Sequence, residues 1–161
     1  MFVSQNFDAG NIEVVSCIRA EDIQLRIRAD HNSEFYQWFY FRLSGVQHSK
    51  CTVRLLNADG AAYPPGFQNY RILYSYDRKE WLRHPTSLHD GVLSFHFESM
   101  HDAVYFAYFT PYSMEQHHDL VAACQQSPRC SHQLLGQTLD GQDIDLLKIS
   151  LPGDTGTADR P

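Results

Sequence analysis

Five side chains of types that bind zinc lie close together in the second half of the sequence: His117, His118, Cys124, Cys130 and His132. Imidazole nitrogens and thiolates are the ligands that zinc prefers, and four of them complete a structural site. The spacing does not match such a site, because Cys124 and Cys130 are farther apart than the usual zinc-binding pair. On a regular helix, neighbouring histidines would also point about 100 degrees apart. The sequence therefore favours free thiols and a polar helix face over a metal site here.

Two further groups have the composition of an active site but a simpler explanation. His31 and Glu34 match the H-x-x-E pattern that provides two metal ligands in some zinc hydrolases, but the turn in which we expect them explains their polarity. Asp140, Asp143 and Asp145 form an acidic group near the end of the sequence. Strand alternation would place Asp143 and Asp145 on one face, which we expect to be solvated.

The common enzyme motifs are also missing from the sequence. It contains no G-x-S-x-G nucleophile motif, no phosphate-binding G-x-x-x-x-G-K loop and no dinucleotide-binding G-x-G-x-x-G. By motif alone we predict no catalytic residue, no cofactor-binding residue and no metal-binding residue in this chain.

The composition indicates a globular protein built around one complete domain. The 161 residues are 43% hydrophobic and 13% aromatic, which is enough apolar surface for a proper core. The net charge is -6 and the 13 lysines and arginines are scattered, so we expect no nucleic-acid partner. The start has no signal-peptide pattern and no apolar run is long enough to cross a membrane, so we expect no membrane partner and a cytoplasmic location. We expect the four cysteines to be free thiols.

Most of the sequence before residue 111 has the pattern of β-strands separated by short turns. Apolar and polar residues alternate in these segments, and Gly, Asn, Asp or Ser residues lie between them. The segments are 11–18, 23–29, 34–43, 51–58, 71–77, 81–85, 92–99 and 103–109. Because the connections are too short for crossover helices, the pattern predicts an antiparallel β-sandwich of about eight or nine strands. Residues 61–70 contain two prolines and Gly66, at which we expect a positive φ, and predict an ordered surface loop.

The pattern changes after residue 112. Residues 113–127 predict a helix that begins with a capping box of Ser113 and Gln116 and ends before Pro128. One face of this helix would carry Met114, His117, Leu120, Val121 and Cys124. Residues 133–150 predict a β-hairpin that turns at Asp140-Gly141, and residues 151–161 predict a loop.

The hairpin resembles the opening hairpin of the catalytic domain of zinc carboxypeptidases. The matching residues are Leu135-Gly136, Thr138, Asp140-Gly141, Ile144 and 146–149, whereas Gln142 stands where that family commonly has Arg. Three segments before it are similar to the amino-terminal domain of the cytosolic carboxypeptidase subfamily: WFYFR (38–42), YPPGFQNYRILYSYDRKEW (63–81) and YFTPYS (108–113). That domain is a β-sandwich, and the resemblance covers nearly the whole chain.

The resemblance implies two parts: an amino-terminal sandwich over 1–111 and the incomplete start of a zinc carboxypeptidase domain over 112–161. In that family the zinc ligands are an H-x-x-E pair beyond the hairpin and a later His, and a Glu acts as general base. The zinc polarises the scissile carbonyl and activates a water molecule. This chain ends at Pro161, before any of these residues, so we expect it to be inactive alone and to need its own missing catalytic domain as partner. The substrates implied are peptide or protein C-termini, from which eukaryotic relatives remove glutamates.

A free-standing β-sandwich module is the alternative. Such a module would bind carbohydrate or protein through exposed aromatic residues, for example Trp38, Tyr63, Phe67 or Trp81. The fold alone does not separate these two functions. An H-x-x-E motif within about twenty residues after Pro161 would decide for the carboxypeptidase, because it would supply two zinc ligands.

Overall fold

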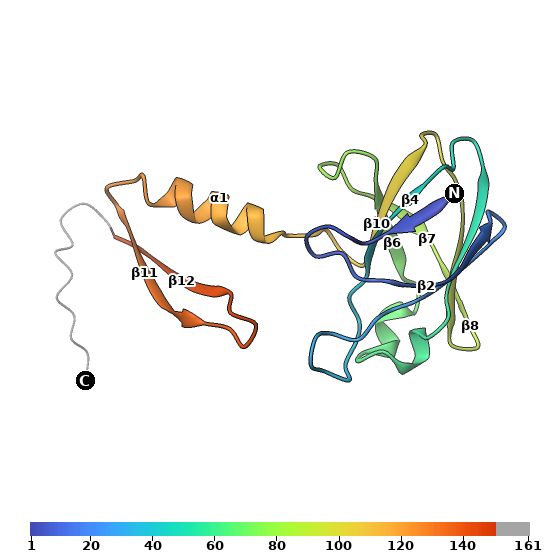
Figure 1. Cartoon of the computed structure of the whole chain (residues 1–161), viewed down its shortest axis with the longest axis horizontal. Helices are drawn as coiled ribbons and strands as arrows, with labels where there is room; N and C mark the ends of the chain where they lie inside the picture. Colours follow the sequence, from blue (N-terminus) through green and yellow to red (C-terminus); the bar gives the residue numbers. More distant parts are fainter. Residues whose placement is uncertain (151–161) are drawn as a thin grey trace. The chain divides into compact units, whose positions relative to one another are not determined.

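The computed structural model describes residues 1–150, so the loop predicted for 151–161 lies outside the described residues. The chain divides into two compact units, Met1–Pro111 and a second one that begins at Tyr112. Figure 1 shows that the first unit consists mainly of strands, and that the second contains one helix and a β-hairpin.

The first unit contains two five-stranded sheets. The first, which we call the β4 sheet, has the spatial order β1 (Phe2–Ser4), β4 (Tyr40–Ser44), β10 (Ala103–Ala107), β6 (Arg71–Ser75) and β7 (Leu82–Pro85). The second, the β5 sheet, has the order β2 (Glu13–Arg19), β3 (Asp22–Arg26), β5 (Lys50–Leu55), β9 (Val92–Glu98) and β8 (Ser87–His89). The predicted sandwich is confirmed, although the sequence did not indicate the short strands β1 and β8.

The core lies between the two sheets and is rich in aromatic rings. Phe106 of the β4 sheet packs against Phe95 and Phe97 of the β5 sheet, with ring centroids 4.9 and 5.1 Å apart. Alternation along β4 explains the inward face, because Phe41 and Leu43 are buried in the core. Burying each such side chain contributes about 1.5–3 kcal/mol to folding, which makes this aromatic core the main support of the sandwich.

One pair of strands differs from the predicted antiparallel arrangement. Strands β3 and β5 pair in parallel, with Ile23 opposite Val53 and Leu25 opposite Leu55. The chain leaves β3, crosses to β4 in the other sheet and returns, so it enters β5 in the same direction. No helix is needed for this crossover, because a strand of the opposite sheet provides the return path.

The segment predicted as a strand over 34–43 begins only at Tyr40. In the residues just before Tyr40, the backbone carbonyls of Trp38 and Tyr36 accept hydrogen bonds from a side chain and from a loop, and not from a neighbouring strand. The carbonyl of Trp38 accepts a hydrogen bond from Asn11 Nδ2 at 2.9 Å, and that of Tyr36 accepts one from the Ala62 amide at 2.8 Å. Aromatic residues gave these positions a strand-like pattern, but their backbone partners lie in loops.

The loop predicted over 61–70 is ordered: it follows the short 3-10 turn η1 (Ala58–Gly60) and contains a second one, η2 (Pro64–Phe67). The positive φ expected at Gly66 is wrong, since this glycine is absent from the positive-φ residues of the chain. A Cβ atom there would lie 2.8 Å from the ring of Tyr63 and 3.0 Å from the hydroxyl of Tyr108. Gly66 therefore permits a close approach of two rings.

The second unit contains α1 (Met114–Cys124), β11 (Cys130–Gln137) and β12 (Asp143–Ile149). The predicted capping box is present, because the Gln116 amide donates to Ser113 Oγ at 3.2 Å and the Ser113 amide donates to Gln116 Oε1 at 2.8 Å. The hairpin turns at Gly141, whose φ of 78° is readily adopted by glycine. Within residues 1–150, no helix is long and apolar enough to cross a membrane.

Candidate functional site

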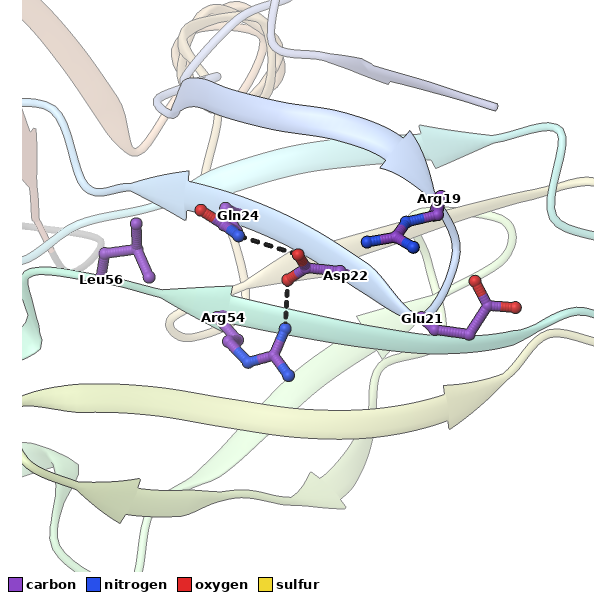
Figure 2. Close-up of a pocket in the computed structure, with 6 residues that line it drawn as sticks. All are labelled: Arg19, Glu21, Asp22, Gln24, Arg54 and Leu56. Carbon is purple, nitrogen blue, oxygen red and sulfur yellow. Dashed lines mark hydrogen bonds and ion pairs between the residues drawn. The ribbon is translucent and has the colours of Figure 1, made fainter.

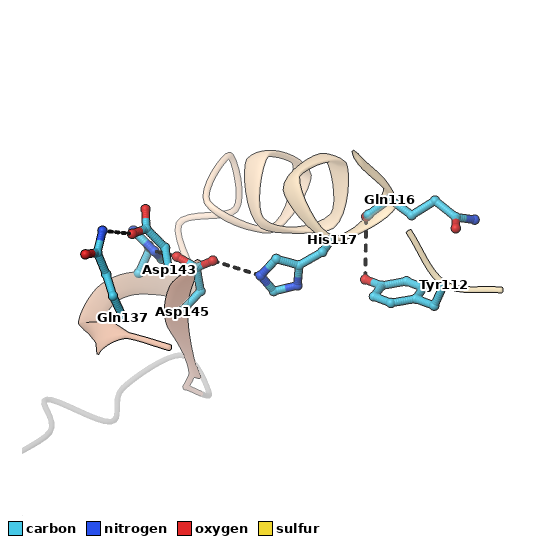
Figure 3. Close-up of polar contacts among 7 residues, drawn as sticks. Tyr112, Gln116, His117, Gln137, Asp143 and Asp145 are labelled. Atoms are coloured by element: carbon cyan, nitrogen blue, oxygen red, sulfur yellow. Dashed lines mark hydrogen bonds and ion pairs between the residues drawn. The ribbon is translucent and has the colours of Figure 1, made fainter. Parts of the chain in front are cut away.

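The most connected polar cluster of the second unit joins two histidines to one carboxylate. His117 Nε2 lies 2.8 Å from Asp145 Oδ2, and His132 Nε2 lies 2.6 Å from Asp145 Oδ1. The residues come from α1, β11 and β12, and Figure 3 shows His117 reaching from the helix to Asp145 on the hairpin. The carboxylate therefore links the helix to both strands of the hairpin.

The environment of Asp145 corrects the prediction that it lies on a solvated face with Asp143. The Asp145 side chain is only 10% exposed. Hydrogen bonds from His132 and then from His117 lower the pKa of its carboxyl group. Asp143 is exposed and accepts a hydrogen bond from Gln137 Nε2 at 2.9 Å (Figure 3). Because both Nε2 atoms bind Asp145, the cluster ties α1 to the two strands of the hairpin.

The remaining predicted metal-ligand candidates do not come together. His118 is exposed on α1, and Cys124 and Cys130 are half-buried free thiols. His31 and Glu34 lie in an exposed segment before β4. Across residues 1–150, no group of three or more His, Cys, Asp or Glu side chains is arranged to hold a metal ion.

The aromatic residues considered for ligand binding have different environments. Phe67 is only 1% exposed and belongs to the core, so the prediction that it is an exposed contact is wrong. Trp38 and Trp81 are half-buried, with their ring centroids 4.7 Å from Phe109 and 5.8 Å from Tyr40. Tyr63, by contrast, is 62% exposed.

A polar depression of about 690 Å³ lies on the outward face of the β5 sheet (Figure 2). Its lining residues are Arg19, Glu21, Asp22, Gln24, Arg54 and Leu56. Asp22 accepts a hydrogen bond from Gln24 Nε2 at 2.9 Å and forms an ion pair with Arg54. The parallel pairing of β3 with β5 creates this contact across 32 positions of sequence, which no local pattern could reveal. Acidic and basic groups balance here, and the lining contains no Ser or Cys nucleophile.

The fold and these clusters define a β-sandwich domain that continues into a helix and a hairpin. Residues 3–109 match the cytosolic carboxypeptidase N-terminal domain family, and the chain belongs to this family. It is also 39% identical over 147 residues to an uncharacterized protein of Zymomonas mobilis, a match that covers 91% of this chain and 38% of that protein.

Two solved structures share the fold of both units. A metallo-carboxypeptidase from Burkholderia cenocepacia has a TM-score of 0.91 and 42% identity, with 96% of this chain and 41% of that chain covered. A metallo-carboxypeptidase from Pseudomonas aeruginosa in complex with (2-guanidinoethylmercapto)succinic acid has a TM-score of 0.91 and 34% identity. This match also covers 96% of this chain and 41% of that chain. The chain thus spans about two fifths of the length of these relatives.

Proposed function

We propose that this chain is the amino-terminal part of a zinc metallocarboxypeptidase that removes C-terminal residues from peptides or proteins. The observation that carries this proposal is the extent of the structural likeness. The metallo-carboxypeptidase of Burkholderia cenocepacia matches 96% of the chain, which extends beyond the sandwich into the helix and hairpin. A likeness limited to the sandwich would have supported a binding module equally well.

The exposed apolar residues of the hairpin support a continuation of this unit. The exposed residues on or beside β11 and β12 are Leu134, Leu135, Leu139, Ile144, Leu146 and Ile149. A two-stranded hairpin is marginally stable by itself, and so many exposed aliphatic side chains are typical of a surface that packs against more protein. In the proposed enzyme, the rest of the catalytic domain covers this hairpin and is its partner.

The described residues, 1–150, do not fit a catalytic zinc site. Such a site needs three protein ligands and an open position, and residues 1–150 contain no group of that kind. In the proposed enzyme the zinc ligands and the general base belong to the rest of the catalytic domain, so the 161-residue chain alone is inactive. This chain contributes the sandwich and a second unit, in which Asp145 joins the helix to the hairpin.

The proposed substrates are peptide or protein C-termini, with terminal glutamate as the first residue to test. The description of the matched family as cytosolic supports a cytoplasmic location.

A direct activity assay tests the proposal. The gene region that encodes this chain is expressed together with its downstream reading frame, and the product is incubated with peptides that end in Glu, Lys or Phe. Mass spectrometry should detect loss of single C-terminal residues, and a chelator should abolish it. The absence of trimming of every peptide by a folded, zinc-loaded protein would contradict the proposal.

A further inference from the structure

Strand β2 forms one edge of the β5 sheet, and within residues 1–150 it pairs with no strand other than β3. An edge strand presents unpaired N–H and C=O groups to solvent. Natural proteins usually protect such an edge with charged residues, proline or a covering segment. The middle of β2, by contrast, contains only uncharged residues, from Val14 to Ile18.

This edge carries several exposed apolar side chains. Ile18 is 87% exposed, and Val14 and Val15 are also exposed. Phe2 is exposed as well, on β1, a strand of the β4 sheet that contacts β2. A single exposed apolar residue is ordinary on a protein surface, but a group of them at one edge is typical of a surface that contacts another molecule.

The pairing of β2 with β3 is irregular, which accounts for two of these residues. The register shifts twice between Val14 and Arg19, and Val15 and Ile18 fall at the shifts, where they have no partner residue on β3. Cys17 also falls there but packs against the core. Because an irregular strand does not readily continue a regular hydrogen-bonded ladder, a contact at this edge relies mainly on side chains.

Opposite charges lie at the two ends of β2. Glu13 begins the strand, Arg19 ends it, and both are exposed. Their opposite residues on β3 are Arg26 and Asp22, yet within residues 1–150 neither the Glu13 nor the Arg19 side chain forms a hydrogen bond or an ion pair. Asp22 is already paired with Arg54. The charges of Glu13 and Arg19 are therefore available to a second molecule.

The sequence of β2, Glu-Val-Val-Ser-Cys-Ile-Arg, is complementary to itself in the antiparallel direction. When two copies meet about a two-fold axis at Ser16, residues at equal distances from Ser16 face one another. Glu13 then faces Arg19 of the second copy, and Val14 faces Ile18 of the second copy. The axis repeats each pair, so every favourable contact occurs twice. Opposite charges or aliphatic side chains directly across two strands contribute about 0.2–1 kcal/mol per pair.

We propose that β2 is the surface through which two copies of this protein associate, antiparallel and centred on Ser16. The partner is a second copy because the same strand supplies both members of every pair, as a two-fold symmetric interface requires. One strand is a small interface, so the dimer is reversible and depends on the protein concentration. This contact does not depend on the proposed peptidase activity.

Sedimentation velocity of charge-reversal variants tests the contact. The protein is expressed with its downstream reading frame and measured over about 1–100 µM. The test variants are Glu13→Lys, Arg19→Glu, an equal mixture of these two, and Ile18→Lys. The matched control is Leu82→Lys, because Leu82 is also an exposed aliphatic residue on an edge strand, β7 of the other sheet. Circular dichroism checks that each variant is folded.

The wild type and Leu82→Lys should form dimers as the concentration rises. Glu13→Lys and Arg19→Glu, each alone, should raise the dissociation constant about tenfold or more, because like charges then meet in both pairs. Ile18→Lys should do the same by placing a charge in both aliphatic pairs.

The mixture of Glu13→Lys with Arg19→Glu separates this contact from any other. Opposite charges meet again when one copy of each variant associates, so the mixture should form dimers nearly as well as the wild type. A monomeric wild type, a mixture of folded variants that stays monomeric, or a dimer that Glu13→Lys, Arg19→Glu and Ile18→Lys leave unchanged would each overturn the proposal.

Discussion

Asp145 illustrates at the residue scale what sequence patterns miss. Its position in an alternating strand predicted a solvated carboxylate, yet it binds His117 and His132, which lie 28 and 13 positions away in the sequence. The residue types of the cluster were visible in the sequence, but their pairing depends on how the helix lies against the hairpin. That packing is set by tertiary contacts, which local periodicity does not encode.

The first prediction concerns acid sensitivity at Asp145. Because the folded pKa of this carboxyl is lowered, the stability that it contributes is fully present above its unfolded pKa of about 3.9 and is lost as the pH falls through the folded value. We expect its 13C carboxyl signal to titrate below pH 3.9. Amide protection in β12 should fall over the same range in the wild type.

The variant Asp145→Asn removes this charge, so the protection of its β12 amides should be lower at neutral pH and should change little through this acid range. Asp119→Asn, at an exposed position of α1, is the matched control and should behave as the wild type. A titration of Asp145 at or above pH 4 would contradict this account of the cluster.

The second prediction concerns Phe106 in the core of the first unit. This ring is buried between Phe41, Phe95 and Phe97, so Phe106→Ala should leave a cavity and lower the free energy of unfolding by about 3–5 kcal/mol. Phe35→Ala changes an exposed ring and should stay within about 0.5 kcal/mol of the wild type. Urea unfolding of both variants measures the difference, and equal losses would argue against this core.

At the element scale, most of the sandwich could be predicted from the sequence. Alternation identified β3, β5, β9 and β10, and the capping box identified the start of α1. The strand β4 was extended too far because aromatic residues before Tyr40 also alternate, although their backbone binds loops. The parallel pairing of β3 and β5 was missed because strand order depends on the path of the chain between two sheets.

The third prediction concerns Asn57, which continues the pairing of β3 beyond the end of β5. Its Oδ1 accepts from the Ile27 amide and its Nδ2 donates to the Ile27 carbonyl, both at 2.9 Å. Asn57→Ala would leave two buried backbone groups without partners and should lower the free energy of unfolding by about 2–4 kcal/mol. Asn6→Ala, at an exposed position, is the control and should have little effect. If both variants unfold at the same urea concentration, Asn57 does not have this role.

At the scale of the whole molecule, the two units have different degrees of self-sufficiency. The first unit encloses its own core between two sheets. In the second, no residue of α1 is fully buried, and the hairpin exposes leucines and isoleucines. This contrast fits a complete sandwich domain followed by the beginning of a larger catalytic domain, which is the central claim of the proposed function.

Metal content measured on two polypeptides tests that claim most directly. The 161-residue chain and a longer product that includes the downstream reading frame are dialysed with zinc and then against buffer, and their metal is quantified by mass spectrometry. We predict no stoichiometric zinc in the short chain and about one zinc per molecule in the longer one, because a catalytic site needs three ligands. Tight zinc binding by the short chain, abolished by Cys124→Ser or Cys130→Ser, would contradict the account.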